Sequence, residues 1–354
     1  MKRCLELAAR GAAWVSPNPM VGCLIVKNGR VVGEVYHHRF GLSHAEVNAL
    51  RAAGRSAKGA TLVVNLEPCV HFGKTPPCAD SIIAAGVREV VIAARDPNPL
   101  VQGKGIERLR NAGIRVQLGV LRTEAQRLNE RFFHFMQTGL PFVGIKLAQT
   151  LDGRIADANG RSKWITSAAA RTEAHRLRAT YDAVMVGAET ALRDDPALTV
   201  RLARGRNPIR VVVDGRLRVH GRLKVFETDA AETILLTSAK AMKSRRRLVE
   251  ALTRRGVRVL AAGDGANLRP ADVLRELAAC EISSVLVEGG STTASMFLES
   301  RLADRVHLFV APALLGAGLT GLSFATKGMK SLIRLNGMTV RRIGADVLLT
   351  GIVR

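Results

Sequence analysis

The sequence predicts an α/β protein with two domains, each built on a sheet covered by helices. Three observations support this prediction. The chain has 354 residues, more than one typical domain needs. A hairpin signal near the N-terminus leads into alternating strand and helix patterns, and a second alternating series begins near Pro141. We therefore expect a boundary between residues 138 and 143, with domains at residues 1–140 and 141–354.

The first domain is expected to begin with a helix and a hairpin. Residues 4–10 form the helix, and residues 21–27 and 31–36 form strands joined by Asn28-Gly29, a strong signal for a two-residue hairpin turn. Helices are then expected over residues 45–52, 79–85, 105–111 and 124–136, alternating with strands over 61–65, 87–94 and 114–118. This order predicts a sheet with helices packed against it.

The second domain is expected to begin with a strand over residues 142–147, followed by a glycine-bearing loop near Gly153. A helix follows over residues 168–179, with Ser167 as its N-cap. Strands over 183–186, 209–213, 233–236, 257–261 and 284–287 alternate with further helices. Residues 306–310 and 345–353 are expected to form edge strands.

Composition and the N-terminus favour a soluble cytoplasmic protein that does not contact a membrane. Apolar residues make up 47% of the chain, yet no run approaches the roughly 20 residues that a membrane-spanning helix needs. Met1-Lys2-Arg3 leads into a segment that is too short and too polar to be the apolar part of a signal peptide. The five scattered cysteines fit a reducing compartment better than a disulfide framework.

The net charge of +23 predicts a partner that carries phosphate, either a nucleic acid or a small metabolite. Basic residues are dense over residues 240–255, where Leu248, Val249 and Leu252 recur at helical spacing. That pattern is typical of a helix with a solvated basic face. Aromatic residues make up only 4% of the chain, which argues against stacking platforms for single strands. A nucleic-acid partner is therefore not expected.

The motif His44-Ala45-Glu46, followed by Pro68-Cys69 and Cys78, predicts a catalytic zinc site. Three protein ligands leave the fourth tetrahedral position of Zn²⁺ open for water. Bound zinc lowers the pKa of such a water to about 7, and Glu46 can carry protons between that water and a leaving amine. Zinc deaminases of nucleobases share this arrangement as His-x-Glu with Pro-Cys-x-x-Cys. Here the two cysteines are nine residues apart, so the chain departs from that spacing.

Other interpretations of these residues are a structural zinc, or cysteines that are simply buried. The presence of Glu46 argues against a structural zinc, which needs no carboxylate beside its ligands. We expect one zinc ion per chain, and we interpret Cys4, Cys23 and Cys280 as small apolar packing residues.

A second motif, Glu288-Gly289-Gly290-Ser291, lies where a strand is expected to end and a helix to begin. Glycines let the backbone approach a pyrophosphate, and a helix N-terminus supplies N–H donors to it. Ordinary turns use the same residues, so the motif alone is weak.

Several segments together resemble the bifunctional deaminase/reductase family of riboflavin biosynthesis. In the first half these are residues 16–22 (Ser-Pro-Asn-Pro-Met-Val-Gly), 44–46 and 67–78, whose last residues are Gly-Lys-Thr-Pro-Pro-Cys. In the second half they are residues 146–147, 151–154, 164–167 and 194–201. The resemblance covers nearly the whole chain.

The resemblance implies two consecutive reactions. A cytidine-deaminase-like α/β/α domain at the N-terminus would hydrolyse the pyrimidine amine of 2,5-diamino-6-(5-phosphoribosylamino)pyrimidin-4-one. An α/β domain similar to dihydrofolate reductase would follow, and it would use NADPH to reduce the ribosyl group, giving 5-amino-6-(5-phosphoribitylamino)uracil. It also implies a homo-oligomer.

The resemblance further implies roles for individual residues of this chain. In the deaminase these are the zinc ligands His44, Cys69 and Cys78, the proton shuttle Glu46, and the substrate-binding residues Asn18, His37, His71 and Lys74. NADPH would meet Ala148, Trp164, Thr190, Asp194, Gly289, Gly290, Ser291 and Thr292. The reductase substrate would meet Ser162, Arg178, Leu198, Arg201 and Glu288. The two arginines suit a ribose phosphate because each offers a planar fork of donors.

Three residues depart from the family pattern. Val70 and Phe72 stand where relatives often have polar residues, and Gly215 stands where relatives can place a serine near the nucleotide. Two other functions remain open from the sequence: a tRNA-type base deaminase with an accessory domain, and a basic RNA-binding protein with a structural zinc. Neither accounts for both the deaminase motif and the long second α/β series.

Overall fold

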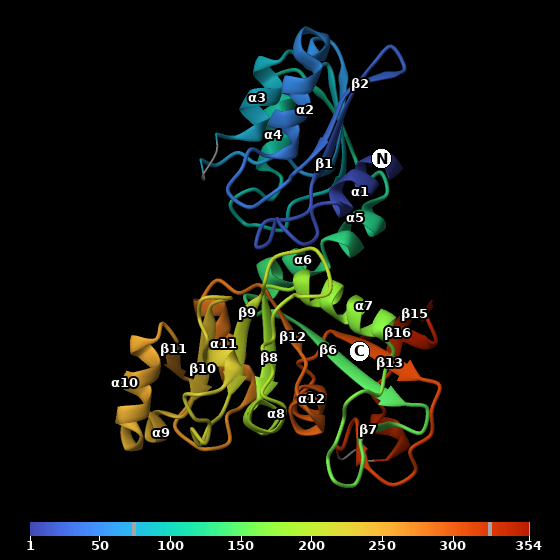
Figure 1. The fold of residues 1–354 in the computed structure, drawn as a ribbon. Helices are drawn as coiled ribbons and strands as arrows, with labels where there is room; N and C mark the ends of the chain where they lie inside the picture. The colour runs from blue at the N-terminus through green and yellow to red at the C-terminus, as the bar shows by residue number, and fades with distance from the viewer. Residues whose placement is uncertain (73–75, 325–327, 354) are drawn as a thin grey trace. The chain divides into compact units, whose positions relative to one another are not determined.

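The computed structural model describes residues 1–72, 76–324 and 328–353 (Figure 1). The chain divides into two compact units, Met1–Gly139 and Leu140–Arg354. The division falls within the segment of residues 138–143. Each unit contains one main sheet with helices on both faces, so the predicted α/β class is confirmed.

The first unit is built on a five-stranded sheet in the order β2-β1-β3-β4-β5. Its strands are β1 (Gly22–Lys27), β2 (Arg30–Tyr36), β3 (Thr61–Leu66), β4 (Glu89–Ala94) and β5 (Arg115–Leu118). β1 runs antiparallel to β2 and β3, whereas β3, β4 and β5 are parallel. Asn28 and Gly29 have φ values of 50° and 76°, which the two-residue hairpin turn requires. The predicted hairpin is confirmed.

Helices cover both faces of this sheet (Figure 1). One face packs against α2 (Ala45–Ala53), α3 (Cys78–Ala84) and α4 (Lys104–Asn111). The other faces α1 (Lys2–Ala9), α5 (Arg122–Leu128) and α6 (Glu130–Thr138). A 3₁₀ turn, Gly54–Ala57, follows α2. The pleat of β1 explains this arrangement, because Cys23 and Ile25 join the α2 side and Leu24 joins the α1 side.

The single helix predicted over residues 124–136 is wrong, since the structure has α5 and α6 in its place. Asn129 lies between them with φ −105° and ψ 25°. Its side chain accepts a hydrogen bond from Met20 N at 2.7 Å and donates one to Met20 O at 2.9 Å. These contacts hold Asn129 in a non-helical conformation. A local sequence pattern could not predict them, because Met20 is 109 residues away in the sequence.

The second unit contains a nine-stranded sheet in the order β11-β10-β9-β8-β12-β6-β13-β16-β15. All neighbouring pairs from β11 to β13 are parallel, and the last two pairs are antiparallel. The strands are β6 (Phe142–Thr150), β8 (Ala183–Gly187), β9 (Ile209–Val213), β10 (Thr233–Thr237), β11 (Arg258–Ala261), β12 (Ser284–Val287), β13 (Arg305–Ala311), β15 (Leu335–Ile343) and β16 (Asp346–Val353).

Two sets of helices cover this sheet (Figure 1). α11 (Pro270–Ala279) and α12 (Ser291–Glu299) pack on one face, against residues such as Ile145 and Val287. α7 (Ala168–Ala179), α8 (Ala188–Asp194), α9 (Ala239–Ser244) and α10 (Arg246–Arg254) pack on the other. Ser167 caps α7 by accepting a hydrogen bond from Ala170 N, as predicted. Short 3₁₀ turns occur at Lys224–Phe226 and Met329–Ser331.

The prediction that residues 306–310 and 345–353 form edge strands is wrong. β13 lies between β6 and β16, and β16 lies between β13 and β15. The edge strand at this end of the sheet is β15. The sequence pattern did not predict β15, because most of its side chains are exposed and lack apolar alternation. A two-stranded ribbon of β7 (Arg154–Ala156) and β14 (Leu319–Thr320) was also missed, since both strands are very short.

The predicted basic helix face is confirmed. Leu252 is buried against the sheet, and Leu248 and Val249 pack beside it, while Arg246 and Arg247 are exposed. Cys4 and Cys23 are fully buried, as interpreted, and Cys280 is half-buried beside Arg258. In the part of the chain that the structure describes, no helix combines the length and apolar character needed to cross a bilayer.

Candidate active sites

The predicted zinc ligands come from three places in the first unit. His44 is the N-cap of α2, Cys69 lies in the loop after β3, and Cys78 is the first residue of α3. Two helix N-termini therefore meet at one point. The partial positive charge at a helix N-terminus favours the thiolate form of a nearby cysteine, which is the form that binds metals.

The ligand atoms of His44, Cys69 and Cys78 all lie within 4.8 Å of one another. His44 Nδ1 is 3.1 Å from Cys78 Sγ and 3.7 Å from Cys69 Sγ. One imidazole nitrogen and two thiols are a donor set that tetrahedral zinc prefers, and three ligands leave a position open. The residues therefore fit a catalytic zinc ion.

The three groups are already polarised toward metal binding. A hydrogen bond from Cys78 lowers the pKa of the Cys69 thiol, and the bond from His44 lowers it further. The same bond to Cys69 raises the pKa of Cys78, as does burial. A divalent cation binds the thiolate forms, so metal binding would release the protons of these thiols.

Glu46 lies in the first turn of α2 and is only 4% exposed. Burial raises the pKa of its carboxyl to about 7, against the opposing effect of the His44 charge. A cation bound to His44 and the cysteines would lower that pKa again. Burial and a bound cation thus act on the Glu46 carboxyl in opposite directions, burial favouring its protonated form and the cation its ionised form.

Two of the predicted deaminase substrate residues lie beside the zinc ligands. Asn18 Nδ2 is 3.2 Å from His37 Nε2, and the His37 ring meets the His44 ring edge-on at a centroid distance of 5.4 Å. Burial lowers the pKa of His37 to about 4, so its ring is neutral at pH 7. His37 Nδ1 is 3.3 Å from Ser43 O, to which it donates, leaving Nε2 to accept from Asn18. His37 is 2% exposed, so its ring belongs to the interior of the site.

The Cys69–Cys78 loop holds the other two predicted substrate residues. The Nδ1 atom of His71 is buried and has no hydrogen-bond partner among the described residues, which suits a group that meets a ligand. Lys74 lies outside the described residues. Phe72 is 80% exposed, whereas Val70 is half-buried and packs against the core below α2 to α4.

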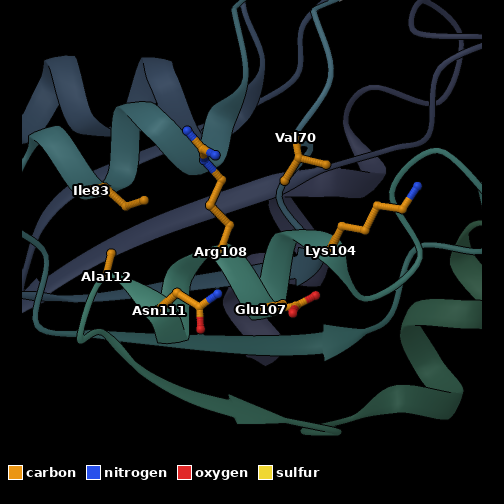
Figure 2. A pocket seen from close by; sticks show the side chains of 7 residues that line it. All are labelled: Val70, Ile83, Lys104, Glu107, Arg108, Asn111 and Ala112. Carbon is orange, nitrogen blue, oxygen red and sulfur yellow. The ribbon is translucent and has the colours of Figure 1, made fainter.

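A shallow pocket of about 440 Å³ lies next to this loop (Figure 2). Figure 2 shows its lining: Val70, Ile83, Lys104, Glu107, Arg108, Asn111 and Ala112. None of the zinc ligands lines it, and most of its residues come from α4. The His44–Cys69–Cys78 cluster therefore lies outside the lining of this pocket.

In the second unit, the strand register brings Lys146 and Glu288 together. Val287 pairs with Ile145 in the parallel alignment of β12 with β6, so Glu288 and Lys146 follow one residue later on neighbouring strands. Ile145 and Val287 face the core under α11 and α12. Because side chains alternate along a strand, Lys146 and Glu288 face α7. Lys146 Nζ is 3.7 Å from Glu288 Oε2.

Arg178 of α7 completes this cluster. Its Nε donates to Glu288 Oε1 at 2.8 Å, its Nη2 donates to Glu288 Oε2 at 3.0 Å, and its Nη1 donates to Thr199 O at 2.6 Å. Burial of Glu288 acts to raise the pKa of its carboxyl, but the charges of Arg178 and Lys146 outweigh burial and lower it to about 2. Glu288 is therefore a buried carboxylate held by two cations.

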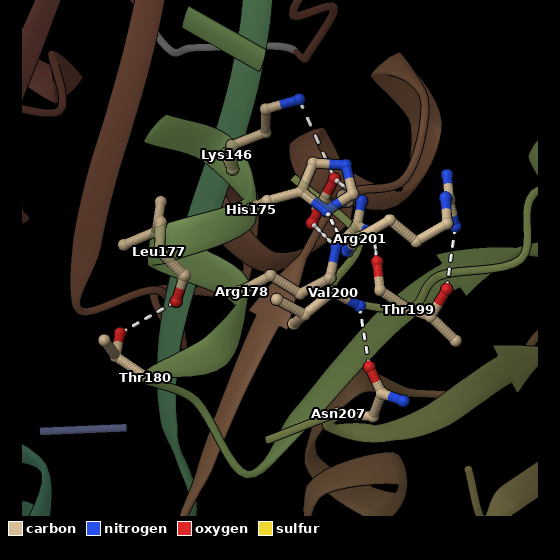
Figure 3. A network of polar contacts seen from close by, with 10 residues as sticks. Lys146, His175, Leu177, Arg178, Thr180, Thr199, Val200, Arg201 and Asn207 are labelled. Carbon is tan, nitrogen blue, oxygen red and sulfur yellow. Dashed lines mark hydrogen bonds and ion pairs between the residues drawn. The ribbon is translucent and has the colours of Figure 1, made fainter. Parts of the chain in front are cut away.

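Arg201 lies on the loop that follows Thr199, close to Arg178 and His175 (Figure 3). Its Nη1 donates to Thr199 Oγ1 at 2.8 Å, and its backbone N–H donates to His175 Nδ1 at 3.0 Å. Burial lowers the pKa of His175 to about 4, and the charges of Arg178 and Arg201 add to that effect. His175 is neutral at pH 7 and accepts this bond. Arg201 is an exposed residue, whereas the side chain of Arg178 is only 10% exposed.

Two of the predicted cofactor residues are in direct contact. Gly290 N donates to Thr190 Oγ1 at 2.9 Å, which joins the turn after β12 to α8. Gly290 is the N-cap of α12 and supplies no side-chain cap, so the first turn of α12, with Ser291 and Thr292, offers backbone N–H groups. This arrangement fits the phosphates of a dinucleotide. A side chain on Gly289 would meet Thr293 Cβ at 2.7 Å.

The departure at Gly215 has a steric cause. A Cβ atom at this position would lie 2.0 Å from the carbonyl oxygen of Ala266. No side chain fits there unless the Ala266 segment moves, so a serine at this position would need a different neighbouring loop.

The remaining predicted reductase residues are more scattered. Among the described residues, Ser162, Trp164 and Asp194 form no hydrogen bond or ion pair with the Glu288 cluster. Trp164 is 71% exposed, and the guanidinium of Arg171 lies 4.4 Å from its ring centroid. Ala148 is half-buried on β6. Leu198 is buried in the core, so only its backbone is available to a ligand.

Two residues of the second site were missed in the site prediction. Lys146 contacts Glu288, and His175 holds the backbone of Arg201. A lysine inside the apolar run Phe142–Leu147 was the available signal, since a charged residue in a buried strand needs a partner. His175 gave no such signal, because its spacing within α7 resembles that of an ordinary core residue.

A zinc-binding α/β/α unit joined to an α/β unit with a dinucleotide-type turn defines a zinc deaminase combined with a reductase. Residues 1–94 match the family described as "Cytidine and deoxycytidylate deaminase zinc-binding region", and residues 141–349 match "RibD C-terminal domain". The chain belongs to the RibD family of bifunctional riboflavin-biosynthesis enzymes.

Relatives and solved structures match over the full length. The chain is 44% identical to "Riboflavin biosynthesis protein RibD" of Aquifex aeolicus (strain VF5), covering 99% of this chain and 96% of the relative. It is 41% identical to the protein of the same name from Escherichia coli (strain K12), over 99% and 97%. The structure of Acinetobacter baumannii RibD, form 1, matches with a TM-score of 0.91 at 38% identity, over 100% and 97%.

A structure from Thermotoga maritima gives a TM-score of 0.87 at 40% identity and also covers 100% and 97%. It is described as a diaminohydroxyphosphoribosylaminopyrimidine deaminase/5-amino-6-(5-phosphoribosylamino)uracil reductase. The chain is accordingly an enzyme with zinc-dependent deaminase and NADPH-dependent reductase activity in riboflavin biosynthesis. It acts on small pyrimidine substrates, and the two RNA-directed alternatives are not favoured.

Proposed function

We propose that residues 1–140 carry out the deamination and residues 141–354 the reduction. The His44–Cys69–Cys78 cluster lies wholly within the first unit, and the Lys146–Arg178–Glu288 cluster lies wholly within the second. In this proposal His44, Cys69 and Cys78 hold one zinc ion. When bound, zinc supplies a water molecule that is a nucleophile at neutral pH.

Glu46 is the residue that moves protons in the deaminase. It accepts a proton from the attacking water and delivers it to the amine that leaves the pyrimidine ring. Its position supports this role, because Glu46 lies two residues after His44 in the first turn of α2, and burial makes its carboxylate a better proton acceptor. Asn18, His37, His71 and Lys74 would hold the pyrimidine and its phosphate, and the neutral ring of His37 would orient the amide of Asn18.

In the reductase, NADPH supplies the hydride when bound, and the chain's residues orient cofactor and substrate. The N-terminus of α12, residues 289–292, and Thr190 would hold cofactor phosphate, with Ala148, Trp164 and Asp194 completing its site. Glu288 would accept hydrogen bonds from the ribose hydroxyls, with Ser162 and the backbone at Leu198 beside it. Lys146, next to Glu288, would donate to the oxygen that becomes a hydroxyl on reduction.

Arg201 is the stronger candidate for contact with the ribose phosphate. Arg201 is an exposed residue, and its guanidinium makes one side-chain hydrogen bond within the described residues. Arg178 was predicted to share this role, but it is buried and three of its N–H groups are engaged by Glu288 and Thr199. We assign to Arg178 the holding of Glu288, with any phosphate contact limited to its two remaining N–H groups.

Product identification tests the assignment of the two reactions. Given the phosphorylated diaminopyrimidine without NADPH, the protein should release ammonia and accumulate the ribosyl aminouracil. With NADPH it should form the ribityl product. A zinc chelator should stop ammonia release while sparing reduction of substrate that is already deaminated. Loss of both reactions on zinc removal would contradict the assignment of one site to each unit.

We also propose that the protein works in the cytoplasm as a homo-oligomer. The cytoplasm is supported by Cys69 and Cys78, which must stay reduced to bind zinc. An oligomer is supported by β15, an edge strand with exposed apolar side chains, Met338 at 44% and Val340 at 68%. Such an edge pairs readily with a second copy. Val340→Lys should shift the mass measured by light scattering toward the monomer, and an unchanged mass would place the interface elsewhere.

A further inference from the structure

Glu67 is a buried carboxylate that neither reaction uses. It directly precedes Pro68-Cys69, where the chain leaves β3, and it is 3% exposed. Its side chain accepts three backbone hydrogen bonds. Oε2 accepts from Asp96 N at 3.2 Å and from Gly103 N at 3.0 Å, and Oε1 accepts from Ile106 N at 3.1 Å. Both carboxylate oxygens are therefore engaged.

Two of these donors belong to the N-terminus of α4. Gly103 is the N-cap of that helix and has no side chain with which to cap it, and Ile106 is its third residue. Backbone N–H groups in the first turn have no partner within the helix. Glu67 supplies the missing acceptor from a different part of the chain, and its negative charge suits the positive end of the helix.

The same helix also packs against the peptide group that precedes Cys69. A Cβ atom on Gly105 would lie 2.2 Å from the carbonyl oxygen of Pro68, so only glycine allows this approach. The first turn of α4 therefore contacts the Glu67–Pro68 segment at two points, the carboxylate of Glu67 and the carbonyl of Pro68.

Cys69 is held from the other side by α3. Its carbonyl accepts from Ala79 N at 3.1 Å, and its Sγ accepts from Cys78 N at 3.4 Å. Cys69 thus lies between the N-termini of α3 and α4. It contacts α3 directly, and it is joined to α4 by the preceding residue pair, in which Glu67 accepts hydrogen bonds from Gly103 and Ile106. We propose that Glu67 is a positioning residue of the deaminase, which fixes Cys69 at the distance from His44 and Cys78 that zinc binding requires.

This inference rests on the proposed ligand set, and it differs from a purely structural role. If Glu67 only caps α4, its loss would lower the thermal stability and leave the metal site unchanged. If it positions Cys69, its loss weakens metal binding and alters the ligand geometry. Partners that orient metal ligands typically contribute about 10- to 100-fold to metal affinity or activity.

The test uses the full chain with Glu67→Gln, loaded with zinc or with cobalt(II). The glutamine has the same shape but replaces one acceptor oxygen by an NH₂ group that faces backbone donors. We expect zinc release to a chromophoric chelator to be at least about 10-fold faster. The thiolate-to-cobalt absorption band should shift or weaken, while the kcat of reduction, measured on deaminated substrate, stays unchanged.

Glu107→Gln is the matched control, because Glu107 lies in the same first turn of α4 but is exposed. It should release zinc at the parent rate. If Glu67→Gln does not fold, Gly105→Ala provides a second test, since its methyl group displaces the Pro68 carbonyl while keeping the carboxylate. The methyl group would also lie 3.1 Å from Glu67 Oε1, so this variant disturbs both contacts of α4 with the Glu67–Pro68 segment and should speed zinc release.

Two results separate the failure of this inference from the failure of the ligand set. Zinc release and a cobalt spectrum within about twofold of the parent in both folded variants would overturn the positioning role and leave only the helix cap. A parent protein whose cobalt form lacks a thiolate band would instead contradict Cys69 and Cys78 as ligands. That result would remove the basis of both proposals.

Discussion

Arg178 and Glu288 form a bidentate ion pair in the interior of the second unit, with nitrogen–oxygen distances of 2.8 and 3.0 Å. The side chains are only 10% and 8% exposed. The two charges belong to α7 and to the end of β12, and Lys146 lies 3.7 Å from the same carboxylate. Arg178, which was predicted to contact the substrate, thus uses two of its N–H groups to hold the Glu288 carboxylate in place.

Removing one partner of this pair should be costly. Arg178→Met leaves the Glu288 carboxylate buried with only Lys146 nearby, so we expect a loss of about 3–5 kcal/mol in the free energy of unfolding. Urea denaturation at neutral pH measures it. Arg176→Met on the same helix is the control, because Arg176 is 65% exposed and its pair with Glu173 contributes about 0–1 kcal/mol. Equal losses in the two variants would show that the buried pair does not stabilise the fold.

The pair also predicts a dependence of stability on pH. The pKa of Glu288 in the folded protein is about 2, below its ordinary value of 4.5. The ionised carboxylate therefore stabilises the folded state above pH 4.5, and this contribution, up to about 3 kcal/mol, is lost as pH falls toward 2. Glu288→Gln should then be most destabilising at neutral pH and progressively less so in acid. A penalty that stays constant from neutral pH to about pH 3 would contradict the lowered pKa.

Arg201 should discriminate between phosphorylated and unphosphorylated substrate. A charge-assisted hydrogen bond contributes roughly 1.5–3 kcal/mol, so Arg201→Ala should lower kcat/KM for reduction of the phosphorylated substrate by roughly 10- to 150-fold. The dephosphorylated substrate should lose little, and NADPH binding should be unchanged. Arg204→Ala, an exposed arginine of the same loop, is the control. Similar losses on both substrates would rule out a phosphate contact at Arg201.

Glu46→Gln should separate zinc binding from deamination. The amide has nearly the same shape as the carboxyl but cannot shuttle protons, so zinc content should remain at one ion per chain while ammonia release falls by at least about 100-fold. Metal analysis and an ammonia assay on the same preparation measure the two properties. Reduction of deaminated substrate serves as the internal control. Normal deamination in this variant would exclude Glu46 from the mechanism.

Cys78→Ser should lower zinc content and deamination together. A serine hydroxyl lacks the charge and softness of the thiolate that Zn²⁺ prefers. Cys280→Ser is the matched control, because Cys280 is half-buried beside Arg258 in the other unit and should leave zinc at the parent level. Stoichiometric zinc in Cys78→Ser, measured by metal analysis, would show that Cys78 is not a ligand.

The sequence by itself determined the α/β class, the hairpin at Asn28-Gly29 and the N-cap at Ser167, because each depends on neighbours within a few residues. It also predicted a zinc site from one imidazole, two thiols and a nearby carboxylate, and the fold brings the imidazole and both thiols together. The family motifs extended that prediction to the second half of the chain. Local chemistry was sufficient for the α/β class, the hairpin and the N-cap, and the assigned roles of the site residues stay predictions.

Only the tertiary structure decided the features that depend on distant partners. Asn129 breaks a predicted helix because it binds Met20, 109 residues away. β13 is an interior strand because it pairs with β6 and β16, and β16 is interior because it pairs with β13 and β15. The residues of a strand do not by themselves determine which strands will pair with it. Arg178 faces Glu288 and Glu67 caps α4 for the same reason. A side chain's type limits what it can bind, but the folded chain determines which partner is within reach.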